Sequence, residues 1–254
     1  MFKEENQVFL YLVGILISFG ILIVTAQNIS LSKILSIGKI FNDPDDIFAD
    51  SPPITIDQNL NYLATVTTNL GTFTIDLFEK SAPTNVNNFV YLANNNYYVN
   101  TLFHRLVPNV LVQGGDRNTL NAEPTDDGQG RAGYVLKGEV NLDSLPLSQE
   151  EKDKLIGEGY LSTASLTTPA AKQYMVFMAN DGYDTNSTQF FIVLADSSSQ
   201  IIQFFNGRFT PIGLITSGIQ TLLNINNVPV DDPESNFAKP TQNIVLQNIV
   251  IQTL

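Results

Sequence analysis

Residues 103–116 read FHRLVPNVLVQGGD, and this stretch carries the most informative chemistry in the chain. Arg105 lies among alternating apolar residues, a pattern that places a permanent cation on one face of a strand. Gln113 follows on the next apolar run, and the paired glycines Gly114 and Gly115 indicate a bulge or a close backbone approach. On spacing alone, such an arginine is most often a surface side chain whose stem covers apolar residues. A second segment is needed before the pattern indicates a site.

That second segment lies further along the chain and consists of two short motifs. Residues 178–180 read Met-Ala-Asn, and residues 189–192 read Gln-Phe-Phe-Ile. In combination with Phe-His-Arg at 103–105 and the Gln-Gly-Gly-Asp run, these motifs resemble the cyclophilin family of peptidyl-prolyl cis-trans isomerases. The resemblance extends over the whole domain, from the opening hairpin to the strand that follows Lys239-Pro240.

The resemblance implies both a fold and an activity. The fold is a closed eight-stranded antiparallel barrel, capped by two helices, with the substrate groove on its outer face. The activity is cis-trans isomerisation of proline-containing polypeptides, and it requires no metal or organic cofactor. Arg105 matches the catalytic arginine. The positions that match the residues holding the peptide backbone are Gln113, Ala179, Asn180 and Gln189, and Phe191 matches one wall of the proline pocket.

The proline pocket is where the sequence departs from the family. Val110 and Leu111 stand where the family usually has a phenylalanine and a methionine. Phe204, Phe205 and Phe209 stand where it usually has a tryptophan, a leucine and a histidine. A smaller floor at Val110 loosens the contact with the prolyl ring, so efficient catalysis does not follow from the resemblance. A non-catalytic cyclophilin-like binding module is the main alternative, and a surface adhesin on an unrelated β sandwich is a third.

The hydrophobic pattern, taken without the resemblance, predicts a mainly β domain. Alternation over residues 64–67 and 72–78, with a glycine in the connection, predicts a hairpin. Further strand-like runs lie at 110–112, 134–136, 175–178, 190–194, 209–215 and 244–251. Many short strands with few helices favour a barrel or a sandwich over an alternating β-α sheet.

Two helices and one helical insertion are expected among these strands. Pro83 suits a first helical turn, and a second helical pattern covers residues 219–225. Within an insertion at about 140–174, Ser148 and Glu151 form a capping box that predicts a third helix. Gly157 is expected to end that helix.

The N-terminal region predicts attachment to a membrane. Residues 8–26 carry no charge, and their length is close to the roughly 20 residues that span a bilayer as a helix. This favours a transmembrane anchor within residues 1–27, with a cleaved signal peptide as the rival. Residues 28–61 are expected to form an acidic, proline-containing linker. The isomerase domain then covers residues 62–254, and we expect it on the extracytoplasmic side.

Composition and single residues exclude several other functions. The formal charge is −12 with only 13 Lys+Arg, so no nucleic-acid partner is expected. The chain has no cysteine and one histidine, which excludes thiol chemistry and a His-rich metal site. That histidine, His104, is expected to be a hydrogen-bonded structural residue. Residues 128–133 fit a dinucleotide-binding pattern, but the flanking strand and helix that the pattern requires are missing.

Overall fold

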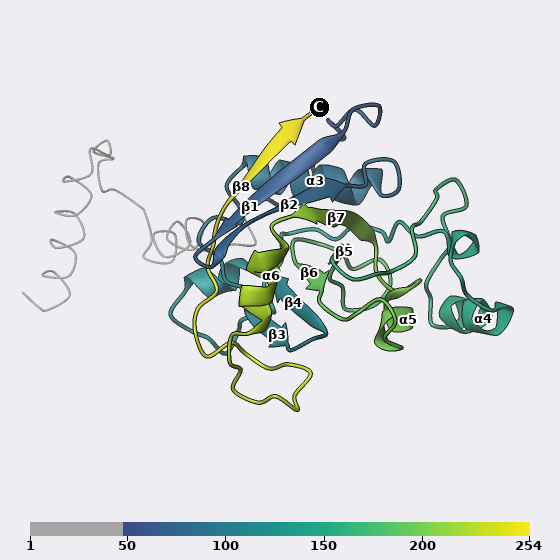
Figure 1. Cartoon of the computed structure of the whole chain (residues 1–254). Coiled ribbons are helices and arrows are strands. Elements are labelled where there is room, and N and C mark those ends of the chain that lie inside the picture. Colours follow the sequence, from purple (N-terminus) through teal and green to yellow (C-terminus); the bar gives the residue numbers. More distant parts are fainter. Residues whose placement is uncertain (1–47) are drawn as a thin grey trace, which may run out of the picture. The chain divides into compact units, whose positions relative to one another are not determined.

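The computed structural model describes residues 48–254, and the proposed membrane segment at residues 8–26 lies outside them. The strands are β1 (Tyr62–Thr68), β2 (Gly71–Leu77), β3 (Arg105–Val107), β4 (Leu111–Gly114), β5 (Met175–Met178), β6 (Phe190–Val193), β7 (Pro211–Ser217) and β8 (Leu246–Thr253) (Figure 1). The α-helices are α3 (Pro83–Asn94), α4 (Gln149–Gly157), α5 (Ile201–Phe205) and α6 (Ile219–Asn226). No helix within residues 48–254 is long and apolar enough to cross a membrane.

The eight strands form one antiparallel sheet, in the order β3-β4-β6-β5-β7-β2-β1-β8. Its two edge strands are joined only by a short contact: Leu102, before β3, forms an isolated bridge with Val245, before β8. Next to this bridge, the Phe103 amide donates to the Ile244 carbonyl at 2.9 Å. In the described residues no continuous ladder joins β3 to β8. The sheet is therefore a curled half-barrel closed at one point, where a fully closed barrel was expected.

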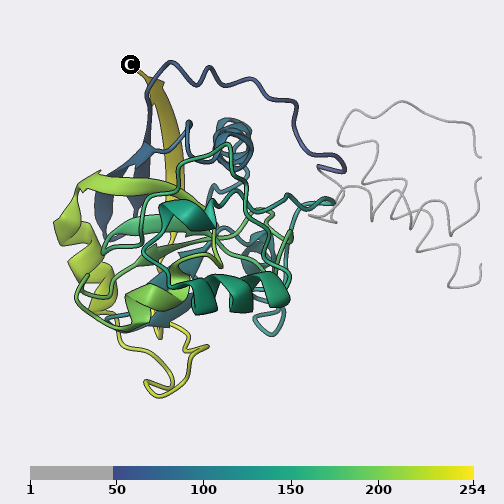
Figure 2. The same cartoon turned by 90° about the vertical axis from the view of Figure 1, so that its right-hand side faces the viewer.

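The inner face of this sheet carries the main core. Residues of β1 alternate between buried and half-buried, as expected for a strand with one face against a core. The interior core includes Val66 and Ile75 from the opening hairpin, Phe190 from β6 and Phe89 from α3. Helix α3 packs against β8, and α6 packs against β2. Figure 2 shows these two helices at different places around the sheet, so the two expected capping helices are present.

Helix α3 also holds the segment that precedes β1. The Asn87 side chain accepts a hydrogen bond from the Thr55 amide at 2.8 Å and donates one to the Pro53 carbonyl at 3.0 Å. Ile56 is buried in the interior core. This segment therefore packs against the folded domain, although the sequence pattern places the start of that domain near Tyr62.

The expected strands agree with the structure except at one position. The hairpin of β1 and β2 is confirmed, with residues 69 and 70 between the strands. The run at 134–136 is not a strand, because only Leu136 forms an isolated bridge, with Asn186. The eighth strand is instead β3, which is three residues long and pairs with β4. Helix α5 was not predicted.

The insertion contains the helix that its capping box predicts. The Glu151 amide donates to Ser148 Oγ at 3.2 Å, and the Ser148 amide donates to Glu151 Oε2 at 2.8 Å. The predicted end is confirmed, because Gly157 is the last residue of α4. The residue in the left-handed conformation is Gly159, with φ of 97°. Leu155 packs into a small cluster within the insertion, which gives α4 its own apolar support.

Candidate functional site

An aromatic cluster lies on the outer face of the sheet, across β4, β5 and β6. Phe177 and Phe191 are Cα partners on neighbouring strands, and their rings stack with centroids 5.4 Å apart. Phe205 of α5 lies 5.4 Å from Phe191, and Phe209 meets Phe191 edge-on at 5.0 Å. Leu111 of β4 belongs to the same cluster. Because successive strand residues point to opposite faces, this outer cluster is separate from the interior core.

A chain of polar side chains, here called the polar relay, runs beside the outer cluster and consists of Arg105, Gln113 and Gln189. Arg105 on β3 and Gln113 on β4 are Cα partners, and Arg105 Nη1 donates to Gln113 Oε1 at 2.8 Å. Gln113 Nε2 donates to Gln189 Oε1 at 2.9 Å. Gln189 Nε2 donates to the carbonyls of Gly128 and Gly130 at 3.0 and 2.7 Å. These contacts fix which way each amide group points.

Asp116 holds the glycine loop on which the relay ends. Its buried carboxylate accepts hydrogen bonds from the backbone amides of Asn118, Gly128 and Gly130. A Cβ atom on Gly130 would lie 2.0 Å from Asp116 Oδ1, so a larger residue does not fit there. Burial raises the pKa of the Asp116 carboxyl, and the three backbone donors oppose that rise. Close packing against Asp116 thus explains the glycine at position 130, which is one of the glycines in the dinucleotide-like pattern at residues 128–133.

The Arg105 guanidinium is held from a second side by a loop. Arg105 Nε donates to the Asn236 carbonyl at 2.7 Å, and the guanidinium carbon lies 5.2 Å from the centroid of the Phe237 ring. A guanidinium has more N–H groups than the two that donate to Asn236 and Gln113. Partial burial lowers the pKa of Arg105, but the ordinary value is so high that the charge is kept. The cation is therefore fixed in place with donors to spare.

Ala179 and Asn180 lie next to the relay in the chain segment that follows β5. The Ala179 amide donates to the Gln189 carbonyl at 2.9 Å, which ties this segment to the relay. Asn180 Nδ2 donates to Asn186 Oδ1 at 3.3 Å and to the Arg208 carbonyl at 3.0 Å. No hydrogen bond joins the backbone N–H or C=O of Asn180 to the described part of the chain. The Asn180 side chain thus joins its own loop to the segment at Arg208, and its backbone groups have no hydrogen-bond partner in the described residues.

The remaining pocket positions differ in accessibility. Val110 and Phe209 are partly buried and pack against the outer cluster. Phe205 is buried, whereas Phe204 is 50% exposed, with the Arg208 guanidinium 4.9 Å from its ring. The Phe204 and Phe209 rings are 6.2 Å apart. The structure therefore gathers the predicted apolar positions on one face, with Phe204 at the rim.

Three residues at this site were not found from the sequence. Phe177 forms the base on which Phe191 stacks; all four residues of β5 are apolar and buried, so no alternation in the sequence marks which of them face outward. Asn236 and Phe237 reach Arg105 from a loop 131 residues further along the chain. No local pattern marks that loop, because its role depends only on where the fold places it.

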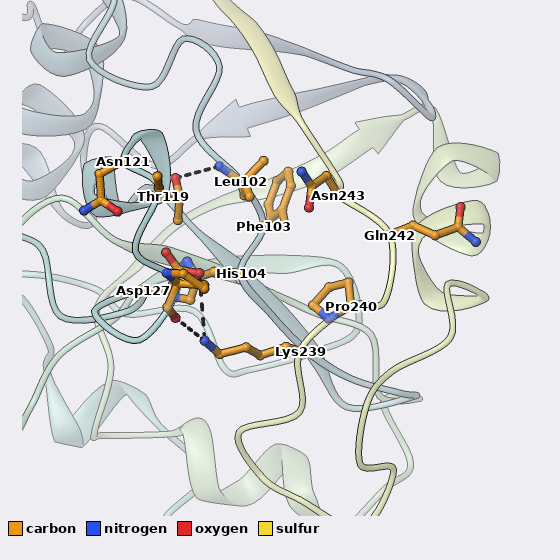
Figure 3. Close-up of a pocket in the computed structure, with 12 residues that line it drawn as sticks. Leu102, Phe103, His104, Thr119, Asn121, Asp127, Lys239, Pro240, Gln242 and Asn243 are labelled. Carbon is orange, nitrogen blue, oxygen red and sulfur yellow. Dashed lines mark hydrogen bonds and ion pairs between the residues drawn. The ribbon is translucent and has the colours of Figure 1, made fainter.

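A separate cavity of about 330 Å³ lies beside His104, Asp127 and Lys239 (Figure 3). Lys239 Nζ lies 3.9 Å from an Asp127 carboxylate oxygen and donates to the Pro124 carbonyl. His104 is buried, as expected; no well-formed hydrogen bond reaches either ring nitrogen in the described residues, and a weaker interaction with the Leu102 backbone raises its pKa against the larger effect of burial. Burial and the neighbouring Arg105 charge lower the pKa of His104 to about 4. The imidazole is therefore neutral near neutral pH.

The fold and the groove together define a class of protein. The family profile described as "Cyclophilin type peptidyl-prolyl cis-trans isomerase/CLD" matches residues 63–251. The chain belongs to this family. It is 33% identical over 170 residues to "Peptidyl-prolyl cis-trans isomerase-like 1" of Emericella nidulans, covering 67% of this chain and 85% of the relative. It is 32% identical over 187 residues to "Peptidyl-prolyl cis-trans isomerase-like 3" of Dictyostelium discoideum, covering 74% of this chain and 93% of the relative.

Solved structures lead to the same class. A cyclophilin-type peptidyl-prolyl cis-trans isomerase of Cryptosporidium parvum matches with a TM-score of 0.55 and 26% identity, covering 76% of this chain and 98% of that one. A structure of the same protein in the presence of the dipeptide Ala-Pro matches with the same TM-score, covering 75% of this chain. The family expected from the motifs is confirmed, and the chain is a peptidyl-prolyl cis-trans isomerase.

Proposed function

We propose that the chain isomerises X-Pro bonds without a covalent intermediate, with Arg105 as the catalytic residue. Amide resonance sets a rotation barrier of about 18–20 kcal/mol. In the twisted state the prolyl nitrogen becomes pyramidal and gains a lone pair. An N–H group aimed at that lone pair makes a hydrogen bond that is stronger in the transition state than in the planar ground state. The observation that supports this proposal is that Arg105 is fixed by Gln113 and Asn236 and still has N–H groups to donate.

The proposal gives the other groove residues a holding function. The prolyl ring packs on the outer cluster, against Val110, Leu111, Phe191, Phe205 and Phe209, with Phe204 at the rim. The substrate backbone lies between the polar relay and the Ala179–Asn180 segment. Gln113 and Gln189 present amide groups of fixed orientation, and Asn180 offers backbone groups that have no partner in the described residues. Burying the ring also removes water from the amide that must twist.

The alternative is a catalytically weak cyclophilin-like binding or scaffold module. One observation favours it: Leu111 and Phe191 are only 5% and 2% exposed. A prolyl ring would then rest mainly on the more accessible side chains of Val110, Phe204 and Phe209. Such a shallow seat would bind proline peptides without holding the ring firmly enough for fast isomerisation.

A protease-coupled assay on a proline tetrapeptide distinguishes the two functions. The full chain, purified in a mild detergent, is compared with buffer containing the same detergent. We expect a first-order acceleration of the slow phase that grows in proportion to enzyme concentration. Peptide binding detected by NMR without any acceleration would establish the binding module and overturn the isomerase assignment for these substrates.

We further propose that residues 8–26 hold the isomerase domain at a membrane, on the extracytoplasmic side, so that its substrates are exported or membrane-proximal polypeptides. The support is the uncharged length of the segment, which can satisfy its backbone hydrogen bonds as a helix in lipid. The acidic, proline-containing stretch after it has the composition of a tether. The rival is a signal peptide cleaved after Ala26.

A carbonate wash and a protease test examine this location. The full chain is expected to stay with the membrane pellet, whereas a chain beginning at Phe48 is expected in the supernatant. Phe48 is the chosen start because Ile56 belongs to the interior core. Protease added to intact cells should remove the domain. Protection until lysis would reverse the orientation, and a mature N-terminus at Gln27 would replace the anchor by a cleaved signal.

A further inference from the structure

The loop between α6 and β8 is braced by its own hydrogen bonds. It covers residues 231–239 and is called the 231–239 loop. The Asp231 amide donates to the Lys239 carbonyl at 3.0 Å, and the Lys239 amide donates back to Asp231 Oδ1 at 2.7 Å. Inside the loop, the Phe237 amide donates to Ser235 Oγ at 3.0 Å. These bonds close the base of the loop and shape its tip.

The same loop is fastened to the rest of the domain through its C-terminal residues, Ala238 and Lys239. The Leu106 amide of β3 donates to the Ala238 carbonyl at 2.9 Å, so the loop lies along the edge of the sheet. The Lys239 ammonium reaches the Pro124 carbonyl and Asp127 at the cavity (Figure 3). In Figure 1 the yellow-green loop extends below the body of the domain, next to β3. A loop held in this way presents its tip residues at a defined place.

Phe237 is the residue presented beside the candidate catalytic group. Its side chain is 77% exposed, the highest exposed fraction among the large apolar residues of the described chain. One face of the ring lies near the Arg105 guanidinium, with 5.2 Å between the guanidinium carbon and the ring centroid. Neither core packing nor a ring–ring contact in the described residues accounts for this position. Water contact over a large aromatic surface is unfavourable, so a ligand that covers it would be stabilised.

We propose that Phe237 is a specificity-determining residue, which selects an aromatic or large apolar side chain at the substrate residue directly after the proline. The proposal rests on the groove assigned above. Arg105 acts at the nitrogen of a ring that the outer cluster holds in place. The residue joined to that ring on its carboxyl side keeps its position while the amide before the ring twists. A rigid aromatic next to Arg105 can therefore contact that residue in both isomers.

The Asn236 carbonyl makes the proposal separable from catalysis by Arg105. It accepts from Arg105 Nε through the main chain, so replacing the neighbouring Phe237 side chain leaves that acceptor in place. Phe237→Ala also removes the ring that lies near the guanidinium, so its effect is read as the ratio of rates between peptides and not as the rate on any one peptide. A uniform loss on all peptides reports on Arg105, whereas a loss of the aromatic preference reports on specificity. Stacking of one exposed aromatic pair corresponds to about a two- to tenfold preference.

The test uses the full chain and NMR exchange rates, which need no coupling protease and so allow any residue after the proline. Peptides carrying phenylalanine, leucine or glycine at that position are compared for wild type, Phe237→Ala and Phe237→Leu. Leu223→Ala, an exposed apolar change on α6, is the matched control. We expect the phenylalanine-to-glycine ratio of kcat/KM to fall about two- to tenfold in Phe237→Ala. Phe237→Leu should keep the preference for leucine over glycine, and the control should match wild type.

Dissociation constants of the same peptides give a second reading that does not depend on turnover. If the chain binds but barely isomerises, the preference should still appear in binding and still be lost in Phe237→Ala. Equal preferences in wild type and Phe237→Ala would overturn the inference. A preference that depends on Phe237 but acts on the residue before the proline would overturn it as well.

Discussion

The polar relay and the outer aromatic cluster are two halves of one groove, and different interactions hold them in place. In the relay, each side chain is fixed by hydrogen bonds of 2.7–2.9 Å, from Arg105 through Gln113 and Gln189 to the Gly130 carbonyl. In the cluster, rings meet at centroid distances of 5.0–5.4 Å around Phe191, and their contacts are non-directional apolar packing.

The comparison explains where this sequence follows its family and where it departs. A hydrogen-bonded chain requires particular atoms at particular distances, and the relay positions are those expected from the sequence resemblance to match the family motif. An apolar cluster tolerates exchange if total volume is kept, and the expected departures at Val110, Phe204 and Phe209 all lie on that side. We infer that substitutions are tolerated more readily in the apolar half of the site. Substitutions in the polar relay and in the aromatic cluster should therefore differ in the size of their effects on activity.

Removing the Arg105 guanidinium should have the largest effect. Arg105→Ala is expected to lower kcat/KM at least tenfold, and about 10²–10³-fold if it supplies the main transition-state donor. Arg105→Lys should not restore activity, because an ammonium cannot keep the bonds to Gln113 and Asn236 and still reach the substrate. Circular dichroism and thermal unfolding should match wild type. Unchanged activity in Arg105→Ala would remove the relay from the mechanism.

Protonation of His104 should weaken the domain as the pH falls. Its pKa of about 4 in the folded state is below the ordinary value of about 6.5, so the unfolded chain binds the proton first. Stability should therefore be lost between about pH 6.5 and about pH 4, by up to roughly 3 kcal/mol. Arg105, Lys239 and Asp127 are the charged groups near it.

Urea unfolding of wild type and His104→Leu at several pH values checks this expectation. The variant should lose less stability on acidification, since it has no imidazole to protonate. The difference between the two curves cancels the common contribution of the carboxylates. Parallel curves would show that His104 is protonated equally easily in the folded and unfolded chain.

Breaking the relay at its middle should have a smaller effect than removing Arg105. Gln113→Leu removes the acceptor for Arg105 Nη1 and the donor to Gln189, while Asn236 still holds the guanidinium. The loss of about 1 kcal/mol of positioning corresponds to roughly a fivefold to tenfold fall in kcat/KM. The NMR signals of the Arg105 guanidinium should broaden in parallel. A normal guanidinium spectrum with normal activity would mean that Asn236 alone positions Arg105.

Enlarging the side chain at Val110, in the aromatic cluster, should have the smallest effect. Val110→Phe is expected to preserve kcat/KM on small proline peptides or raise it a few fold, because it enlarges the contact with the prolyl ring. Val110→Ile is the matched control, which adds one methylene at the same position and should change little. A large loss in Val110→Phe with a normal fold would mean that the cluster is shaped differently from the family pocket.

How far the sequence predicts this molecule depends on the range of the interaction. The hairpin, α3 and the Ser148 capping box follow from neighbouring residues, and the sequence pattern found all three. The long motifs predicted the family, which is confirmed, whereas the roles they assign to the site residues stay predictions. Phe237 was not predicted from the sequence, because its contact with Arg105 depends on the tertiary placement of a loop that has no motif.

Two of the errors have equally physical causes. Residues 134–136 are a short apolar run typical of a strand, but only Leu136 forms a bridge, so no ladder forms. The hydrogen bond expected for His104 is weak, because the side chain lines a cavity and meets only the Leu102 backbone. A pattern in the sequence indicates burial, but it does not show which polar atoms lie within reach.

The contact between Asn87 and the segment before β1 has a mechanical consequence. Asn87 makes hydrogen bonds to Thr55, Ile56 and Pro53 from the side of α3. A pull that arrives along the chain from its N-terminal side meets this clamp before it reaches β1, which lies between β2 and β8 in the sheet. The clamp can yield and reform while the strands stay paired. The Asn87 hydrogen bonds therefore bear such a pull before it reaches the paired strands of the sheet.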